Sequence, residues 1–227
     1  MLFWDYTYIL VLIGALICSV AAINVKSTFN RYSSIHNARG MTGRDAAERV
    51  LHQAGIYDVR IERVNGSLTD HYSPKEKVLR LSDSVYSSTS VAAIGVAAHE
   101  CGHACQHAED YAPIRLRTAI VPVTNVCSKL WYITFLLGVL LFEAFPALAY
   151  LGIIMFAAVV VFQAVTLPTE LDASGRALNT LEADGILDYR EIPMAKKVLK
   201  AAAFTYVAAL ITSIMQLLRL LAAVRNN

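Results

Sequence analysis

Apolar residues concentrate in four long stretches of the chain. The first, residues 6–25 ("YTYILVLIGALICSVAAINV"), carries no charge over a length that can cross the roughly 30 Å hydrocarbon layer as a helix. The others cover residues 119–145, 147–167 and 201–218, with "EAFP" as a tight turn between the second and the third. The pattern predicts four transmembrane helices, arranged as an N-terminal anchor (1–25), a hairpin (119–167) and a C-terminal helix with its tail (201–227).

Two features of these stretches leave alternatives open. Ser19-Val20-Ala21 resembles a signal-peptide cleavage site, but Asp5 and the absence of Lys or Arg before the first run favour an uncleaved anchor. Pro122 and Lys129 interrupt the second stretch. Its span either starts near Leu130, with Lys129 at the interface, or starts earlier with Lys129 held against protein.

The polar segment between the first two stretches has the pattern of a small α+β domain. Thr42 followed by Asp45 forms a capping box before an amphipathic helix that Gly55 ends. Residues 57–64 alternate as a half-buried strand and end at Asn65-Gly66, a hairpin turn signal, and residues 77–83 read as a second strand. Residues 87–90 supply N-caps for a helix through residue 110. We therefore expect a mainly α membrane protein with a zincin-like domain at 26–118 and a further cytoplasmic helix at 168–200.

The distribution of charge gives this arrangement an orientation. Charged residues make up 17% of the chain, against about 25% in soluble domains, and nearly all Lys and Arg fall in segments 26–118 and 168–200. The positive-inside rule places both segments in the cytoplasm and both termini outside, with Arg225 as the one exception. A net charge of +2 without a basic, aromatic-rich patch argues against a nucleic-acid partner. The four cysteines do not have the spacing of a disulfide framework, so we expect free thiols.

The stretch "AAHECGHACQH" contains the H-E-x-x-H pattern at His99, Glu100 and His103. On a helix the two histidines lie one turn apart on one face, so both imidazoles can reach one zinc ion. Glu100 lies beside the metal, where it can deprotonate a bound water. Gly102, between the histidines, permits close approach of another element. The surrounding Ala, Val and Ile residues would make an unpaired His-Glu-His set costly to bury.

The third ligand must come from elsewhere, because His107 lies too far along the helix. Three histidines at four-residue spacing span about 12 Å, more than one tetrahedral ion can collect. The metzincin pattern requires His at position 109, where this chain has Glu109. Cys101 and Cys105 point to other sides of the helix and are expected to pack.

Glu170, in "LPTELDASGRAL", is the stronger carboxylate candidate. The hairpin returns the chain to the membrane face that it left, so Glu170 shares a face with His99 and His103. We expect Pro168 to end or kink the third span and Glu170 to lie in the first turn of the segment after it. A carboxylate favoured at a helix N-terminus is the alternative explanation of Glu170, and Asp172 is the weaker alternative ligand.

These residues also carry a family resemblance. Three parts of the chain resemble the YugP-like neutral zinc metallopeptidases, a prokaryotic membrane family. They are the run from Gly66 through Asn125, "FQAVTLPTELDASGRAL" and "KKVLKAAAFTYVAALITSIMQLLRLL". The resemblance implies a zinc peptidase without identifying a substrate. "TELDASGRA" is also similar to the third-ligand helix of HtpX-like membrane gluzincins, where an aspartate four residues after the glutamate supports the site. Here that position is Ser174, which can hydrogen-bond to a ligand without adding charge.

The expected function is peptide-bond hydrolysis by one Zn²⁺ per chain at the cytoplasmic face of a prokaryotic inner or plasma membrane. His99, His103 and Glu170 would hold the zinc, and Glu100 would act as general base on the zinc-activated water. His71 and Tyr72 are candidate oxyanion stabilisers, and the strand at 77–82 is a candidate edge for an extended substrate. Expected partners are a peptide or membrane-protein substrate and the bilayer, and homo-oligomers are compatible with the sequence.

Two other functions compete with this one. A non-catalytic membrane scaffold that binds a partner and retains the zinc site would normally close that site with four protein ligands. A zinc transporter would place its polar residues inside the spans.

Overall fold

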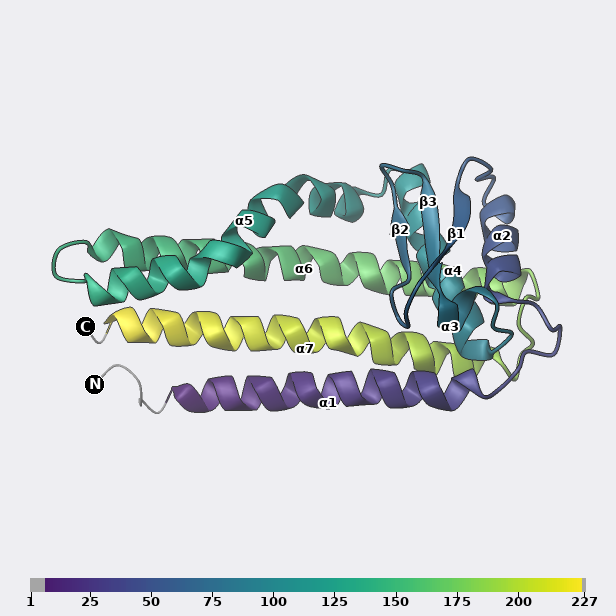
Figure 1. Cartoon of the computed structure of the whole chain (residues 1–227), viewed down its shortest axis with the longest axis horizontal. Coiled ribbons are helices and arrows are strands. Elements are labelled where there is room, and N and C mark those ends of the chain that lie inside the picture. The colour runs from purple at the N-terminus through teal and green to yellow at the C-terminus, as the bar shows by residue number, and fades with distance from the viewer. Residues whose placement is uncertain (1–6, 226–227) are drawn as a thin grey trace. The chain divides into compact units, whose positions relative to one another are not determined.

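The computed structural model describes residues 7–225 (Figure 1). Asp5 and Tyr6 of the predicted anchor and the last two residues of the predicted tail lie outside this range. In chain order the elements are α1 (Tyr8–Ser33), α2 (Gly43–Gln53), β1 (Arg60–Val64), β2 (His71–Ser73), β3 (Val78–Ser82), α3 (Asp83–Tyr86), α4 (Val91–Ala108), α5 (Ala112–Leu140), α6 (Pro146–Ala183) and α7 (Ile192–Arg225).

The prediction of four membrane helices and a small α+β part is confirmed. Helices α1, α5, α6 and α7 are each long and apolar enough to cross a bilayer. Of the two alternatives for Pro168, the one in which it ends the third span is wrong, because α6 continues as one helix through Pro168 to Ala183. Glu170 therefore lies well inside a helix, which removes the explanation of Glu170 as a carboxylate at a helix N-terminus. A kink at Pro168 stays a prediction.

The chain forms two compact units. Of the described residues, unit 1 comprises 7–22, 116–167 and 204–225, and unit 2 comprises 23–115 and 168–203. In unit 1, α5 and α6 cross closely at two glycines: a Cβ atom on Gly138 would lie 2.0 Å from the Ala149 backbone nitrogen, and one on Gly152 would lie 2.6 Å from that of Phe135. The absence of these two side chains allows the predicted hairpin to pack backbone against backbone.

The sheet of unit 2 differs in topology from the expected hairpin. Its strand order is β1-β3-β2, with β1 parallel to β3 and β2 antiparallel to β3. Asn65-Gly66 turns the chain, but the antiparallel partner of β3 is β2, a three-residue strand between the two predicted strands. Because β3 is the central strand, the prediction that it offers a free edge to a substrate is wrong.

Helices α2 and α4 begin as the sequence predicts. The Thr42 hydroxyl accepts a hydrogen bond from the Asp45 amide, and the Asp45 carboxylate accepts one from the Thr42 amide. Ser90 caps α4 by accepting from the Ala93 amide. Gly55, with a φ of +72°, follows the end of α2. These local signals fix where the two helices start and where α2 stops.

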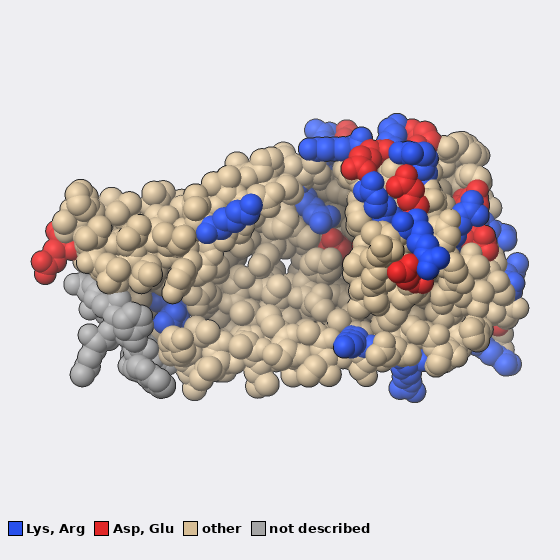
Figure 2. All heavy atoms as spheres, in the orientation of Figure 1, with Lys and Arg blue, Asp and Glu red and all other residues tan. Residues whose placement is uncertain are grey.

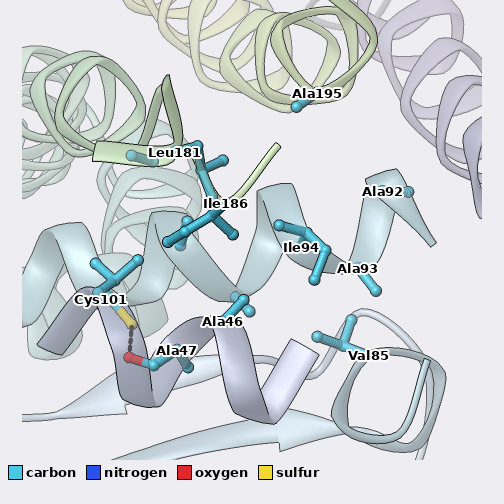
Figure 3. Packing of buried hydrophobic residues seen from close by; sticks show 14 of the residues in the cluster. Ala46, Ala47, Val85, Ala92, Ala93, Ile94, Cys101, Leu181, Ile186 and Ala195 are labelled. Carbon is cyan, nitrogen blue, oxygen red and sulfur yellow. Dashed lines mark hydrogen bonds between the residues drawn. The ribbon is translucent and has the colours of Figure 1, made fainter. Parts of the chain in front are cut away.

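The core of unit 2 forms where small residues allow helices to come close. Figure 3 shows Ala46 and Ala47 of α2 against α4, with the Cys101 thiol donating to the Ala47 carbonyl at 3.5 Å. Leu181 and Ile186 cover another side of α4. Figure 2 shows Lys, Arg, Asp and Glu gathered over the strands of unit 2. Unit 2 is thus a domain packed around the H-E-x-x-H helix, with charged side chains over its strands.

Candidate metal centre

Helix α4 places the two motif histidines on one face. The ring centroids of His99 and His103 are 4.9 Å apart and the rings are nearly perpendicular. Glu100, between them in sequence, is only 9% exposed. The spacing of the motif therefore gives the predicted local geometry.

Gly102 allows α6 to approach this face. A Cβ atom at Gly102 would lie 2.6 Å from the Ala173 carbonyl oxygen, closer than any side chain permits. Ala173 is three residues after Glu170 on α6, so this contact brings the Glu170 carboxylate to the histidines. Glu170 Oε2 lies 3.3 Å from His99 Nε2 and 3.5 Å from His103 Nε2.

These separations suit a zinc ion. Zn–N and Zn–O bonds of about 2.0–2.1 Å in a tetrahedron place two ligand atoms about 3.3 Å apart. The three ligand atoms all lie within 4.8 Å of one another. Two histidines and one glutamate are a donor set of catalytic zinc sites, which leave the fourth position for water or substrate. The side chains of His99, His103 and Glu170 thus fit the metal that the sequence predicts.

Each histidine is held through its other ring nitrogen. Ser174 Oγ lies 3.1 Å from His99 Nδ1, and Gln106 Oε1 lies 3.0 Å from His103 Nδ1. Such contacts fix the orientation of a metal-binding imidazole and leave Nε2 for the metal. Ser174 therefore makes the hydrogen bond that the sequence allowed for it.

Gln106 is a positioning residue that the sequence analysis did not identify. Its side chain is fully buried, and its amide nitrogen donates to the Thr169 carbonyl at 2.8 Å and to Asp172 Oδ2 at 2.7 Å. Because both amide hydrogens are used, the amide oxygen must face His103, which then donates from Nδ1. The only sequence signal was a polar residue three positions after His103 on a mostly apolar helix.

Asp172, the weaker alternative ligand, is committed elsewhere. Its carboxylate accepts from Gln106 and, at 2.6 Å, from Arg176 Nε, and Arg176 also pairs with Glu109 at 2.6 Å. These bonds join the end of α4 to α6. Asp172 therefore supports the site through Gln106 and is absent from the three-residue cluster.

The electrostatics of the centre favour positive charge. Burial opposes protonation of His103, but its hydrogen bond to Glu170 and the charges of Glu100 and Glu170 outweigh burial and raise its pKa. A buried carboxylate is costly unless it is paired or coordinates a metal. A metal cation bound between the two histidines and Glu170 would likewise compensate the charge of this buried carboxylate.

The remaining candidates lie outside the cluster. His71 is exposed on β2, with Nδ1 2.9 Å from the Thr69 carbonyl oxygen. Tyr72 is half-buried, and its ring centroid is 5.7 Å from that of His107 on α4. The oxyanion roles of His71 and Tyr72 stay predictions. Cys101 is fully buried against α2, and within residues 7–225 neither cysteine of α4 joins the His-His-Glu cluster.

Fold and site together define a helical membrane protein with a two-histidine, one-glutamate candidate metal centre. The chain matches, over residues 7–225, the family described as "Putative neutral zinc metallopeptidase", and it belongs to that family. It is 47% identical over 199 residues, 88% of each chain, to the "Putative membrane protease YugP" of Bacillus subtilis (strain 168). No solved structure matches it. The resemblance to a membrane zinc metallopeptidase family is thereby confirmed.

Proposed function

We propose that this protein is a zinc-dependent endopeptidase that acts at the cytoplasmic face of a prokaryotic inner or plasma membrane. His99, His103 and Glu170 would hold one Zn²⁺. The observation that carries the proposal is the position of Glu170 Oε2, 3.3 and 3.5 Å from the two imidazole nitrogens, as tetrahedral zinc requires.

Glu100 is the group that we assign to proton transfer. When bound, zinc supplies Lewis acidity, which lowers the pKa of a water ligand towards about 7 and polarises the scissile carbonyl. Glu100 accepts the proton of the attacking water as the new carbon–oxygen bond forms. It then gives that proton to the amine nitrogen as the carbon–nitrogen bond breaks.

Two further parts of the proposal rest on sequence patterns. The cytoplasmic orientation follows from the concentration of Lys and Arg in segments 26–118 and 168–200. His71 and Tyr72, on the strand beside α4, are the proposed oxyanion donors. We expect a peptide or membrane-protein substrate.

The competing function is a non-catalytic scaffold that retains a structural zinc. Structural zinc sites are normally closed by four protein ligands. Within the described chain the cluster gathers three. The set of ligands therefore favours the enzyme.

The test compares the wild type with Glu100→Gln and Glu170→Ala by zinc content and by proteomics of membrane fractions. We expect Glu100→Gln to keep zinc and to lose about 10²–10⁴-fold in cleavage rate, because it removes only the general base. Glu170→Ala should lose zinc. Glu48→Gln, an exposed carboxylate of α2, is the matched control. Persistent cleavage in Glu100→Gln would rule out the mechanism, and zinc retention in Glu170→Ala would rule out the ligand assignment.

A further inference from the structure

Unit 2 contains a polar cavity of about 530 Å³ between α1 and α7, apart from the candidate metal centre. Its cationic lining comes from Arg31 on α1 and from Lys197 and Lys200 on α7. Hydroxyl and amide groups line it as well, on Ser27, Thr28 and Asn24 of α1. No proposed zinc ligand, nor Glu100, lines this cavity.

All the charged side chains that line the cavity are cations. No carboxylate lines it, and none of its three cations forms an ion pair with any of residues 7–225. Arg31 lies in the last turn of α1, where the helix dipole favours a cation. Lys197 and Lys200 lie in the N-terminal part of α7, where the dipole offers no such stabilisation. Pairing with neighbouring carboxylates therefore does not explain why three cations lie together here. The helix dipole does not explain the positions of the two lysines.

The cavity begins where the apolar runs of both helices stop. The uncharged run of α1 ends at Val25, so Asn24 lies at its end and the other lining residues of α1 follow it. The apolar run of α7 starts at Ala201, directly after Lys200. On α1 the preceding residues Val20 and Ile23 are 52% and 68% exposed, so an acyl chain has an apolar surface beside the cavity. Cations and hydrogen-bond donors at the end of a membrane-crossing run match the level of lipid headgroups.

We propose that this cavity binds the phosphate of an anionic phospholipid headgroup. Arg31, Lys197 and Lys200 neutralise the phosphate, the hydroxyl and amide groups of α1 donate hydrogen bonds to its oxygens, and the acyl chains lie along the exposed apolar face of α1. A zwitterionic lipid carries its own cation and is bound more weakly. Free phosphate lacks the acyl chains and competes poorly.

The binding test uses the purified full chain in detergent, titrated with phosphatidylglycerol, phosphatidylcholine or inorganic phosphate and read by native mass spectrometry. The variant changes the three cations to Gln, and the charge-matched control changes three exposed cations outside the cavity: Arg44, Arg60 and Lys75. Each juxtamembrane cation contributes about fivefold, so we expect the cavity variant to lose roughly 100-fold in phosphatidylglycerol affinity and the control to stay within about twofold. Equal loss in both variants, equal binding of phosphatidylcholine, or full competition by phosphate would overturn the proposal.

A second measurement needs no variant and so does not depend on the folding of one. The wild-type chain is placed in nanodiscs of phosphatidylglycerol or of phosphatidylcholine, and its lysines are labelled with an amine-reactive reagent. Lys197 and Lys200 should react several-fold more slowly in phosphatidylglycerol. Lys196, exposed on the same helix but outside the cavity, reports the general effect of surface charge. Equal protection of Lys196 would show that no specific site exists.

Discussion

Gly102→Ala is the substitution that most directly tests how the metal centre is assembled. The new methyl group would lie 2.6 Å from the Ala173 carbonyl oxygen and 3.1 Å from the Ala173 carbonyl carbon and Cα. All three atoms belong to the backbone of α6, so no side-chain rotation can relieve the overlap. Helices α4 and α6 must move apart.

The size of that movement follows from the contact distance. Ordinary contact starts near 3.4 Å, so the closest pair must separate by about 0.8 Å. Metal sites tolerate deviations of only about 0.2 Å in bond length. Overpacking of this kind costs about 1–3 kcal/mol of folding free energy. Because Glu170 moves with α6, we expect zinc affinity to fall at least about tenfold.

Gly95→Ala on the same helix is the matched control. Its methyl group would meet Ala195 Cβ at 3.5 Å, an ordinary contact, and Ala stabilises a helix relative to Gly by up to about 1 kcal/mol. Zinc affinity is measured by chelator competition, and stability by thermal unfolding with and without chelator. If Gly102→Ala binds zinc as tightly as Gly95→Ala, close approach at Gly102 is not what positions the third ligand.

Three further predictions concern single side chains. Ser174→Ala should weaken zinc binding about tenfold by freeing the first histidine of the motif, and Ser174→Asp should restore it; equal affinity of all three forms in chelator competition would contradict this. Burial raises the pKa of the Cys101 thiol well above its ordinary value, so in native protein at pH 8 it should alkylate far more slowly than in urea; similar rates by mass spectrometry would show that the site opens. Thr42→Ala removes a capping hydrogen bond and should lower the free energy of unfolding by about 1 kcal/mol, whereas an unchanged urea midpoint would mean that α2 does not depend on its cap.

The parts of the site that lie on one helix could be read from the sequence. His99 and His103 follow from the four-residue repeat of a helix, and their side chains meet as that repeat requires. Glu170 was found from the hairpin topology and the family resemblance. Neither spacing nor composition links it to His99, which lies 71 positions earlier in the chain. Gln106 was missed because its role depends on Thr169 and Asp172, which approach it only once α6 has packed on α4.

The sheet shows a similar limit. Alternation located β1 and β3, but strand pairing depends on contacts between distant segments, and Asn65-Gly66 reports only the local turn. The parallel register of Arg60 with Val78 requires the chain between them to cross over, and β2 is too short for alternation to be visible. Propensity therefore located the two longer strands without determining which one is central.

Pro168 shows how a wrong local expectation changes the functional argument. A span that ended there would have put Glu170 on a separate element, at a position along the helix axis that the apolar run does not fix. Because α6 is continuous, the helical rise of 1.5 Å per residue places Glu170 about 4.5 Å along the axis from Leu167, the last residue of that run. Under the proposed function, the third zinc ligand then lies within one helical turn of the end of a membrane-crossing segment. Hydrolysis would take place at the level of the bilayer surface, which favours peptide bonds that a substrate carries next to its own membrane segment.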